Sequence, residues 1–149
     1  MNPITVRQAV LADIDAVAQL FDAYRQFYGK TSDIEAAKVF LLERFNHGES
    51  ILFLAFENDK PIGFTQLYPS FSSVSMARVY VLNDLYVDSQ VRGKGVGKKL
   101  LNAATEYAKS FAAVRVTLST DIANKTAQFM YESAGWKRDS EYFVYHLSM

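Results

Sequence analysis

The chain has 149 residues, of which half are apolar and 14% are aromatic, so it can bury the core of one globular domain. Its 16 basic and 16 acidic residues give a formal net charge of zero, which argues against a general nucleic-acid binder. Because the chain has no cysteine and only two histidines, we expect no disulfide, no thiol nucleophile and no metal site. No apolar run approaches membrane-spanning length and no leader pattern opens the chain, so we expect a single cytoplasmic domain over residues 1–149.

The first half of the chain predicts two helices followed by three strands. After a short strand at residues 4–7, apolar residues at helical spacing run from Ile14 to Tyr28 and stop at Gly29. Ser32 and Glu35 have the spacing of a capping box, which predicts a second helix running to Phe45. The strands are expected at residues 51–56, 62–68 and 78–87, with a hairpin turn at 58–60 and a polar stretch outside the core at 70–75.

A strand at residues 85–87 leads into a loop with Gly93, Gly95 and Gly97, and then into a helix whose apolar residues keep the 3.6-residue period to Phe111. The N-terminus of such a helix favours phosphate binding, because its first backbone N–H groups are free and the helix dipole places partial positive charge there. The charge of four basic side chains favours the same ligand: Arg92, Lys94, Lys98 and Lys99.

Two common phosphate loops do not fit this stretch. A P-loop needs Ser or Thr after its Gly-Lys, whereas Gly97 is followed by two lysines. A dinucleotide fingerprint lies near the start of its domain and is followed by an acidic residue after the next strand, but the strand at 114–118 has no acid before Asp121. A short helix at residues 123–134, ended by Gly135, and two last strands, at Trp136 and at 142–147, complete the prediction.

The pattern Gln90-x-x-Gly93-x-Gly95 resembles the signature loop of the GNAT superfamily of acetyl-CoA-dependent N-acetyltransferases. A second stretch, Asn124-x-x-Ala127 followed by Tyr131-Glu132-x-x-Gly135-Trp136, resembles the family's later helix. Taken by itself, the first pattern has an alternative interpretation, in which its glycines only allow a turn. The resemblance implies a mixed α/β sheet in the order β-α-α-β-β-β-α-β-α-β-β, with the cofactor cleft where the central strands splay, and a homodimer.

The resemblance also implies how acetyl-CoA would be held. The backbone of Leu85, Tyr86 and Val87 would pair with the pantetheine arm, and the Val87 N–H would donate to the thioester oxygen. Asn124 would contact the cofactor or cap its helix. The loop residues expected at the phosphates are Arg92, Gly93, Lys94, Gly95, Val96, Gly97 and Lys98, whereas Lys99 fits a solvated helix surface equally well.

Tyr131 matches the tyrosine that many family members use as a general acid toward the coenzyme A thiolate, although it also lies on the apolar face of its helix. Asn83-Asp84 resembles a Glu-Asp pair of polyamine-type members, in which the glutamate is the base. Because the Asn83 amide cannot take a proton, the base would be Asp84 or a water chain, or the amine would arrive deprotonated. Asp84 also fits a structural role beside a strand bulge.

The acceptor would lie among aromatic side chains such as Tyr24, Tyr28 and Phe71, which fit a core or a dimer interface equally well. The resemblance favours an enzyme that acetylates a small primary amine (a polyamine, amino acid or aminoglycoside) by direct attack in a ternary complex. A protein or peptide acetyltransferase and a non-catalytic acetyl-CoA sensor are the alternatives. A weak resemblance to histone, polyamine and D-amino-acid acetyltransferases does not identify the acceptor.

Overall fold

The computed structural model describes residues 3–149 and divides them into two compact units, one ending at Leu118 and one running from Ser119 to Met149. Within residues 3–149, no helix is both long enough and apolar enough to cross a membrane.

The first unit is a five-stranded mixed sheet with three α-helices, in the element order that the sequence predicts up to this point. The strands stand in the order β1-β2-β3-β4-β5, and every neighbouring pair is antiparallel except β4 and β5. The elements are β1 (Ile4–Gln8), α1 (Ile14–Phe27), α2 (Ile34–Asn46), β2 (Ile51–Glu57), β3 (Lys60–Ser72), β4 (Ala77–Val87), α3 (Val96–Ser110) and β5 (Val116–Thr117).

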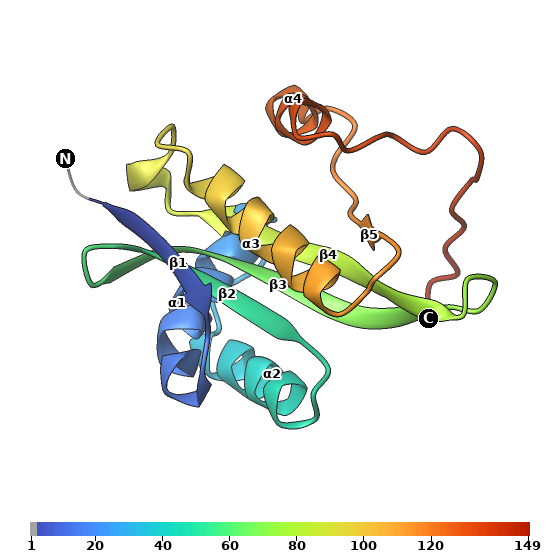
Figure 1. Ribbon diagram of the computed structural model, residues 1–149. Coiled ribbons are helices and arrows are strands. Elements are labelled where there is room, and N and C mark those ends of the chain that lie inside the picture. Colours follow the sequence, from blue (N-terminus) through green and yellow to red (C-terminus); the bar gives the residue numbers. More distant parts are fainter. Residues whose placement is uncertain (1–2) are drawn as a thin grey trace. The chain divides into compact units, whose positions relative to one another are not determined.

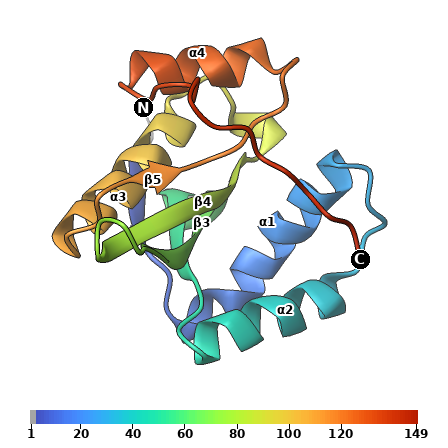
Figure 2. The same ribbon diagram turned by 90° about the vertical axis from the view of Figure 1, so that its right-hand side faces the viewer.

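Helices α1 and α2 cover one face of this sheet and α3 covers the other (Figure 1 and Figure 2). On the first face, Phe64 of β3 packs 6.1 Å from Phe21 of α1, between ring centroids. On the second face, α3 lies so close to β3 that a Cβ on Gly63 would come within 3.2 Å of Leu100 and 2.8 Å of the Tyr86 carbonyl. Glycine at position 63 therefore allows the strand and the helix to pack.

The start of α2 differs by one residue from the capping box that the sequence predicts. Asp33, not Ser32, is the N-cap, and its Oδ1 accepts from the Ala36 N–H at 3.1 Å. The Ser32 hydroxyl instead donates to the buried Asp22 carboxylate at 2.7 Å. The prediction was wrong at this position because a tertiary partner uses the serine, while the aspartate does the capping.

Strand β3 is longer than predicted, because its pairing with β4 continues to Ser72 through the polar stretch. The register between these strands shifts once: Gln66 faces Asp84, but Leu67 faces Leu82. Asn83 is thus the extra residue of a β-bulge. Because of the bulge, the two sides of Asn83 present their side chains to opposite faces. Tyr80 and Leu82 face α3, where the Tyr80 ring lies 5.8 Å from that of Tyr107. Asp84 and Tyr86 face α1, where the Tyr86 ring makes an edge-to-face contact with Tyr24.

The second unit contains one helix, α4 (Lys125–Ser133). Asn124 caps it by accepting from the Ala127 N–H at 3.1 Å, and Gly135, with φ of 93°, follows its end as predicted. The two expected last strands are not formed: the described residues after α4 include neither helix nor strand, and their large apolar side chains, such as Phe143 and Tyr145, are exposed. High strand propensity alone was insufficient, because a strand forms only where a neighbouring strand supplies its ladder.

Candidate active site

Asp84 is a buried carboxylate in the middle of the sheet, on the face covered by α1. Its side chain is 3% exposed. Oδ2 accepts from the Gln66 amide at 2.6 Å, and Oδ1 accepts from the Asn83 amide at 3.0 Å. Burial raises the pKa of Asp84 above its ordinary value, and the hydrogen bonds from Gln66, Asn83 and Tyr24 oppose that shift only in part. The carboxyl is therefore closer to a neutral-pH proton acceptor than an exposed aspartate would be.

Two tyrosines stand around this carboxyl. The Tyr24 hydroxyl lies 3.4 Å from the Asn83 carbonyl oxygen, and its pKa is raised by burial and by the negative charge of Asp84. The Tyr68 hydroxyl accepts from Gln66 at 3.1 Å, and burial together with Asp84 raises its pKa to about 12. Both phenols are protonated at neutral pH, so neither adds a charge beside the Asp84 carboxyl.

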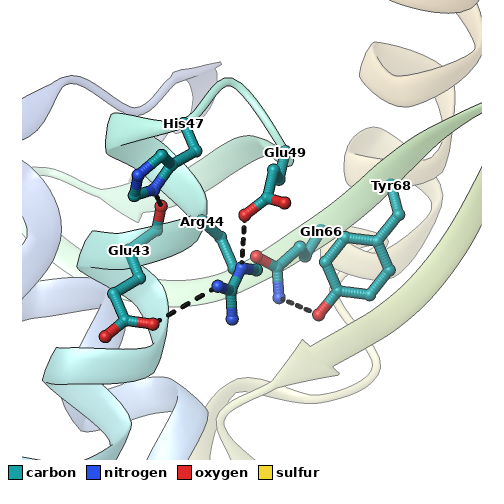
Figure 3. A network of polar contacts seen from close by, with 6 residues as sticks. All are labelled: Glu43, Arg44, His47, Glu49, Gln66 and Tyr68. Atoms are coloured by element: carbon teal, nitrogen blue, oxygen red, sulfur yellow. Dashed lines mark hydrogen bonds and ion pairs between the residues drawn. The ribbon is translucent and has the colours of Figure 1, made fainter.

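Arg44 of α2 lies beside this cluster but is already paired with acidic side chains. Figure 3 shows its guanidinium between Glu43 and Glu49, next to Gln66 and Tyr68. The Arg44 Nε–Glu49 distance is 2.9 Å, and the positive charge of Arg44 lowers the pKa of Tyr68, against the larger effects of burial and Asp84, which raise it. Asp84 therefore keeps no cationic partner among the hydrogen bonds and ion pairs of the described residues.

Strand β4 has an open edge beyond Val81. Strand β5 pairs with it only at Tyr80↔Val116 and Val81↔Thr117, whereas pairing with β3 continues to Val87. Within this unit the pairing of β4 with β5 thus ends at Val81, next to the residues where the central strands are predicted to splay. Leu85, Tyr86 and Val87, the predicted partners of a pantetheine arm, lie along this edge.

The glycine loop connects the open end of β4 to α3. Gly95 is the N-cap of α3 with φ of 76°, a left-handed conformation that glycine adopts without strain. Asp33 and Asn124 cap α2 and α4 with side-chain oxygens, but Gly95 offers none. The N–H groups of the first turn of α3, at Val96, Gly97 and Lys98, are therefore available to an anion.

The basic residues of this loop differ in their surroundings. The Lys94 ammonium pairs with Glu57 of β2 at 3.1 Å and so ties the loop to the sheet. The Arg92 Nε donates to the Val87 carbonyl at 3.1 Å, and its guanidinium lies 5.7 Å from the ring centroids of both Phe27 and Tyr86. Lys98 is exposed on the first turn of α3. The loop, the end of α1 and the end of β4 thus lie together.

Of the predicted acceptor residues, the structure brings two together and leaves one apart. The rings of Tyr24 and Tyr28 are 5.1 Å apart, and Tyr24 is 6.2 Å from Tyr86. Phe71 lies near the far end of β3, opposite Arg78, and is exposed. At about 3.3 Å per residue, five positions separate Phe71 from Gln66 by about 16 Å.

The remaining predicted residues lie in the second unit. Asn124 caps α4, which was one of its two expected roles. The Tyr131 ring lies 6.0 Å from that of Trp136, and its side chain is partly buried. Gln66, which the sequence analysis did not single out, belongs to the Asp84 cluster. A lone glutamine in a buried strand gave no sequence signal beyond its breaking of the apolar run.

Comparison with known proteins agrees with this geometry. The family model described as "Acetyltransferase (GNAT) family" matches residues 17–136. The chain belongs to the GNAT family of acetyltransferases. The uncharacterized N-acetyltransferase YhfO of Bacillus subtilis (strain 168) is 45% identical over 146 residues, which is 98% of each chain. A crystal structure described as a "probable acetyltransferase" is 43% identical and superimposes with a TM-score of 0.92 over 97% of each chain.

A more distant GNAT relative is the D-amino-acid N-acetyltransferase of Saccharomyces cerevisiae, 34% identical over 58% of this chain and 55% of that protein. With the family and these N-acetyltransferase relatives established, the chain is an acetyltransferase enzyme, and acetyl-CoA use follows as a family property. The family model does not specify the amine acceptor.

Proposed function

We propose that this GNAT enzyme moves the acetyl group of acetyl-CoA to the primary amine of a small molecule, as one domain over residues 1–149. A polyamine, an amino acid and an aminoglycoside are the candidate acceptors. The observation that carries the proposal is the open edge of β4, which runs into a loop and helix start without side-chain caps. A cytoplasmic homodimer is part of the proposal on the family resemblance.

The residues of the first unit fit acetyl-CoA. The first-turn N–H groups at Val96, Gly97 and Lys98 would bind the pyrophosphate, with Arg92 and Lys98 adding charge. Along Leu85, Tyr86 and Val87, the backbone groups that do not pair with β3 would bond the amides of the pantetheine arm as an added strand would; the Val87 carbonyl already accepts from Arg92. Acetyl-CoA supplies an acyl group activated as a thioester; the chain supplies position and proton transfer.

Over the reaction the acceptor ammonium loses two protons and the coenzyme A thiolate gains one. Asp84 would take a proton from the acceptor ammonium, directly or through water, so that the amine nitrogen can form its bond to the thioester carbonyl carbon. The Val87 N–H would stabilise the negative charge that develops on the carbonyl oxygen. As the C–S bond breaks, the thiolate would take a proton from Tyr131, a role proposed from its motif alone, and the second proton that the nitrogen loses would restore the tyrosine hydroxyl.

The charge around Asp84 supports a cationic acceptor. A buried carboxylate without an ion-pair partner attracts an ammonium group, and the rings of Tyr24, Tyr28 and Tyr86 offer apolar and cation–π contact. The relative that acts on D-amino acids is consistent with a small amine. We therefore favour small amines over protein acceptors.

The deciding experiment measures coenzyme A release from acetyl-CoA with a panel of amines, and acetyl-CoA binding alongside. The panel contains spermidine, lysine and other amino acids of both hands, an aminoglycoside and a peptide with a free N-terminus. Turnover of a small amine supports the proposal. Turnover of the peptide alone would favour the protein-acetyltransferase alternative, binding without turnover would favour a sensor, and no binding would exclude the glycine loop as the cofactor site.

The proposed role of Tyr131 has its own test. Tyr131→Phe removes only the hydroxyl, so we expect kcat to fall about tenfold or more with little change in acetyl-CoA affinity. Steady-state kinetics and a binding titration measure the two effects separately. A variant with full kcat would remove Tyr131 from the mechanism.

A further inference from the structure

Gln66 lies at the centre of β3, directly opposite Asp84 on the neighbouring strand β4, and the residue is 0% exposed. Its Nε2 donates to the Asp84 Oδ2 at 2.6 Å and to the Tyr68 hydroxyl at 3.1 Å. The first of these is the shortest hydrogen bond that the Asp84 carboxyl makes; the Asn83 amide donates at 3.0 Å. Gln66 is therefore the main contact that fixes the direction of this carboxyl.

The Gln66 amide presents its NH2 group to Asp84. An ionised carboxylate only accepts hydrogen bonds, so this orientation suits the ionised form of Asp84. The opposite end of the amide, Oε1, is buried and has no hydrogen-bond partner among the described residues. Leaving a buried carbonyl unpaired is unfavourable, and a charge-assisted bond of 2.6 Å is the gain that opposes it.

The groups that face Asp84 include few charges. Tyr24 of α1 and Tyr68 of β3 are protonated phenols with raised pKa values. Arg44 of α2 already has two acidic partners, Glu43 and Glu49. Burial raises the pKa of Asp84, and the hydrogen bond from Gln66 is the largest effect that lowers it. The ionised form of Asp84 thus depends mainly on a neutral amide.

We propose that Gln66 is the positioning residue of the reaction: it holds the Asp84 carboxylate ionised and directed toward the acceptor amine. This inference rests on the proposed function, in which Asp84 takes the proton. Gln66 acts through Asp84 and has no contact of its own with the reacting atoms in this proposal.

The test is the pH dependence of kcat/KM with the best amine of the panel. In Gln66→Met, which has a similar volume but no donor, we expect the acid-side midpoint to move up by about one pH unit. In Gln66→Glu, two neighbouring carboxyls share a proton, so the midpoint also moves up, and this nearly isosteric variant serves if the first does not fold. An unshifted midpoint in the folded variants would overturn the proposal.

Thr65→Val is the matched control. Thr65 is the neighbouring residue of β3, is equally buried, and donates from Oγ1 to the backbone carbonyl of Asp84 at 2.8 Å. The Thr65→Val substitution removes a buried hydrogen bond to the Asp84 backbone and leaves the contacts of the carboxyl in place, so we expect the acid-side midpoint of kcat/KM not to move. A shift as large as that of Gln66→Met would mean that general loosening of β3, and not the amide, is responsible, which would overturn the proposal.

A second measurement does not depend on turnover. Carbon-13 NMR titration of the Asp84 carboxyl in the free enzyme should give a higher midpoint in Gln66→Met than in the wild type, and the same midpoint in Thr65→Val. Asp84→Asn separates the two proposals. If it keeps the wild-type rate and pH profile, the base assignment fails and this inference fails with it. If Asp84→Asn loses activity while Gln66→Met changes neither the kcat/KM midpoint nor the NMR midpoint, only the role of Gln66 is overturned.

Discussion

The first unit contains two buried aspartates, Asp22 on α1 and Asp84 on β4, with opposite electrostatics. Asp22 is 2% exposed and Asp84 is 3% exposed. Asp22 accepts from the Ser32 hydroxyl and the Asp33 N–H, each at 2.7 Å, and from the Gln26 amide at 3.0 Å. These bonds, with Ser32 first, lower its pKa despite burial. At Asp84, burial outweighs the hydrogen bonds and the pKa rises.

The comparison shows that low solvent exposure alone does not raise the pKa of a carboxyl: at Asp22 the hydrogen bond from Ser32 outweighs desolvation, whereas at Asp84 desolvation is the largest effect. Asp22 joins the end of α1 to the start of α2, because its ionised form is bonded by a hydroxyl and by the backbone of the α2 N-cap. It therefore supports the fold as a fixed anion. Asp84 receives the side-chain amides of Gln66 and Asn83 and the Tyr24 hydroxyl, and because burial outweighs these bonds it gains a proton more readily, which is the property that a general base requires.

The largest expected effect is on activity at Asp84. Asp84→Asn should lower kcat/KM about 100-fold at neutral pH, with recovery at high pH, where the amine is already deprotonated. Asp22→Asn, at an equally buried site, is the control and should keep the activity per folded molecule. Steady-state rates between pH 6 and 10 measure both. Equal losses in the two variants would remove the distinction drawn between the two carboxylates.

The second effect is on stability at Asp22. Asp22→Asn should lower the free energy of unfolding by about 2 kcal/mol at neutral pH, because an NH2 group takes the place of a carboxylate oxygen that accepts charge-assisted hydrogen bonds. Since the pKa of Asp22 is lowered by folding, its contribution is full above the unfolded pKa of about 4 and is lost as pH falls through the lower folded value. Urea unfolding at pH 7 and at low pH would measure this, and a pH-independent difference would contradict it.

The third effect is the pH dependence of stability at Asp84, which runs in the opposite direction to that at Asp22. Its folded pKa is raised, so its stabilising contribution is full below the unfolded pKa of about 4 and is lost as pH rises through the folded value. Relative to the wild type, Asp84→Asn should therefore gain stability on going from low to neutral pH, by about 1 kcal/mol. The same urea series measures it. A relative loss over this pH range, as expected for Asp22→Asn, would show that the two sites do not differ.

The smallest effect is expected at Tyr24. Its hydroxyl helps to lower the pKa of Asp84, after the amides of Gln66 and Asn83. Tyr24→Phe should therefore move the acid side of the kcat/KM profile up by a fraction of a pH unit, less than Gln66→Met does. A larger shift than in Gln66→Met would make Tyr24 the main partner of the carboxyl.

Much of the fold was predictable because its signals are local. The helical spacing from Ile14 onward gave α1, the glycine after residue 134 gave the end of α4, and both helices are observed with bounds close to those expected. The strand–loop–helix around Gly95 was predictable for the same reason, since a left-handed residue before a helix favours glycine. The last two strands were not, because their formation depends on a neighbouring strand.

The sequence by itself determined the family, the glycine loop and the presence of an acid at Asp84, because each depends on residue type and short spacing. Only the tertiary structure decided what surrounds that acid. Plain alternation would place Leu82 and Asp84 on the same face of β4, but the bulge at Asn83 separates them. The partner of Asp84 is Gln66, 18 residues earlier in the chain, and nothing local to either residue fixes the register that pairs them. A β-sheet sets such pairs through its ladder, so the chemistry of this carboxyl depends on the folded hairpin.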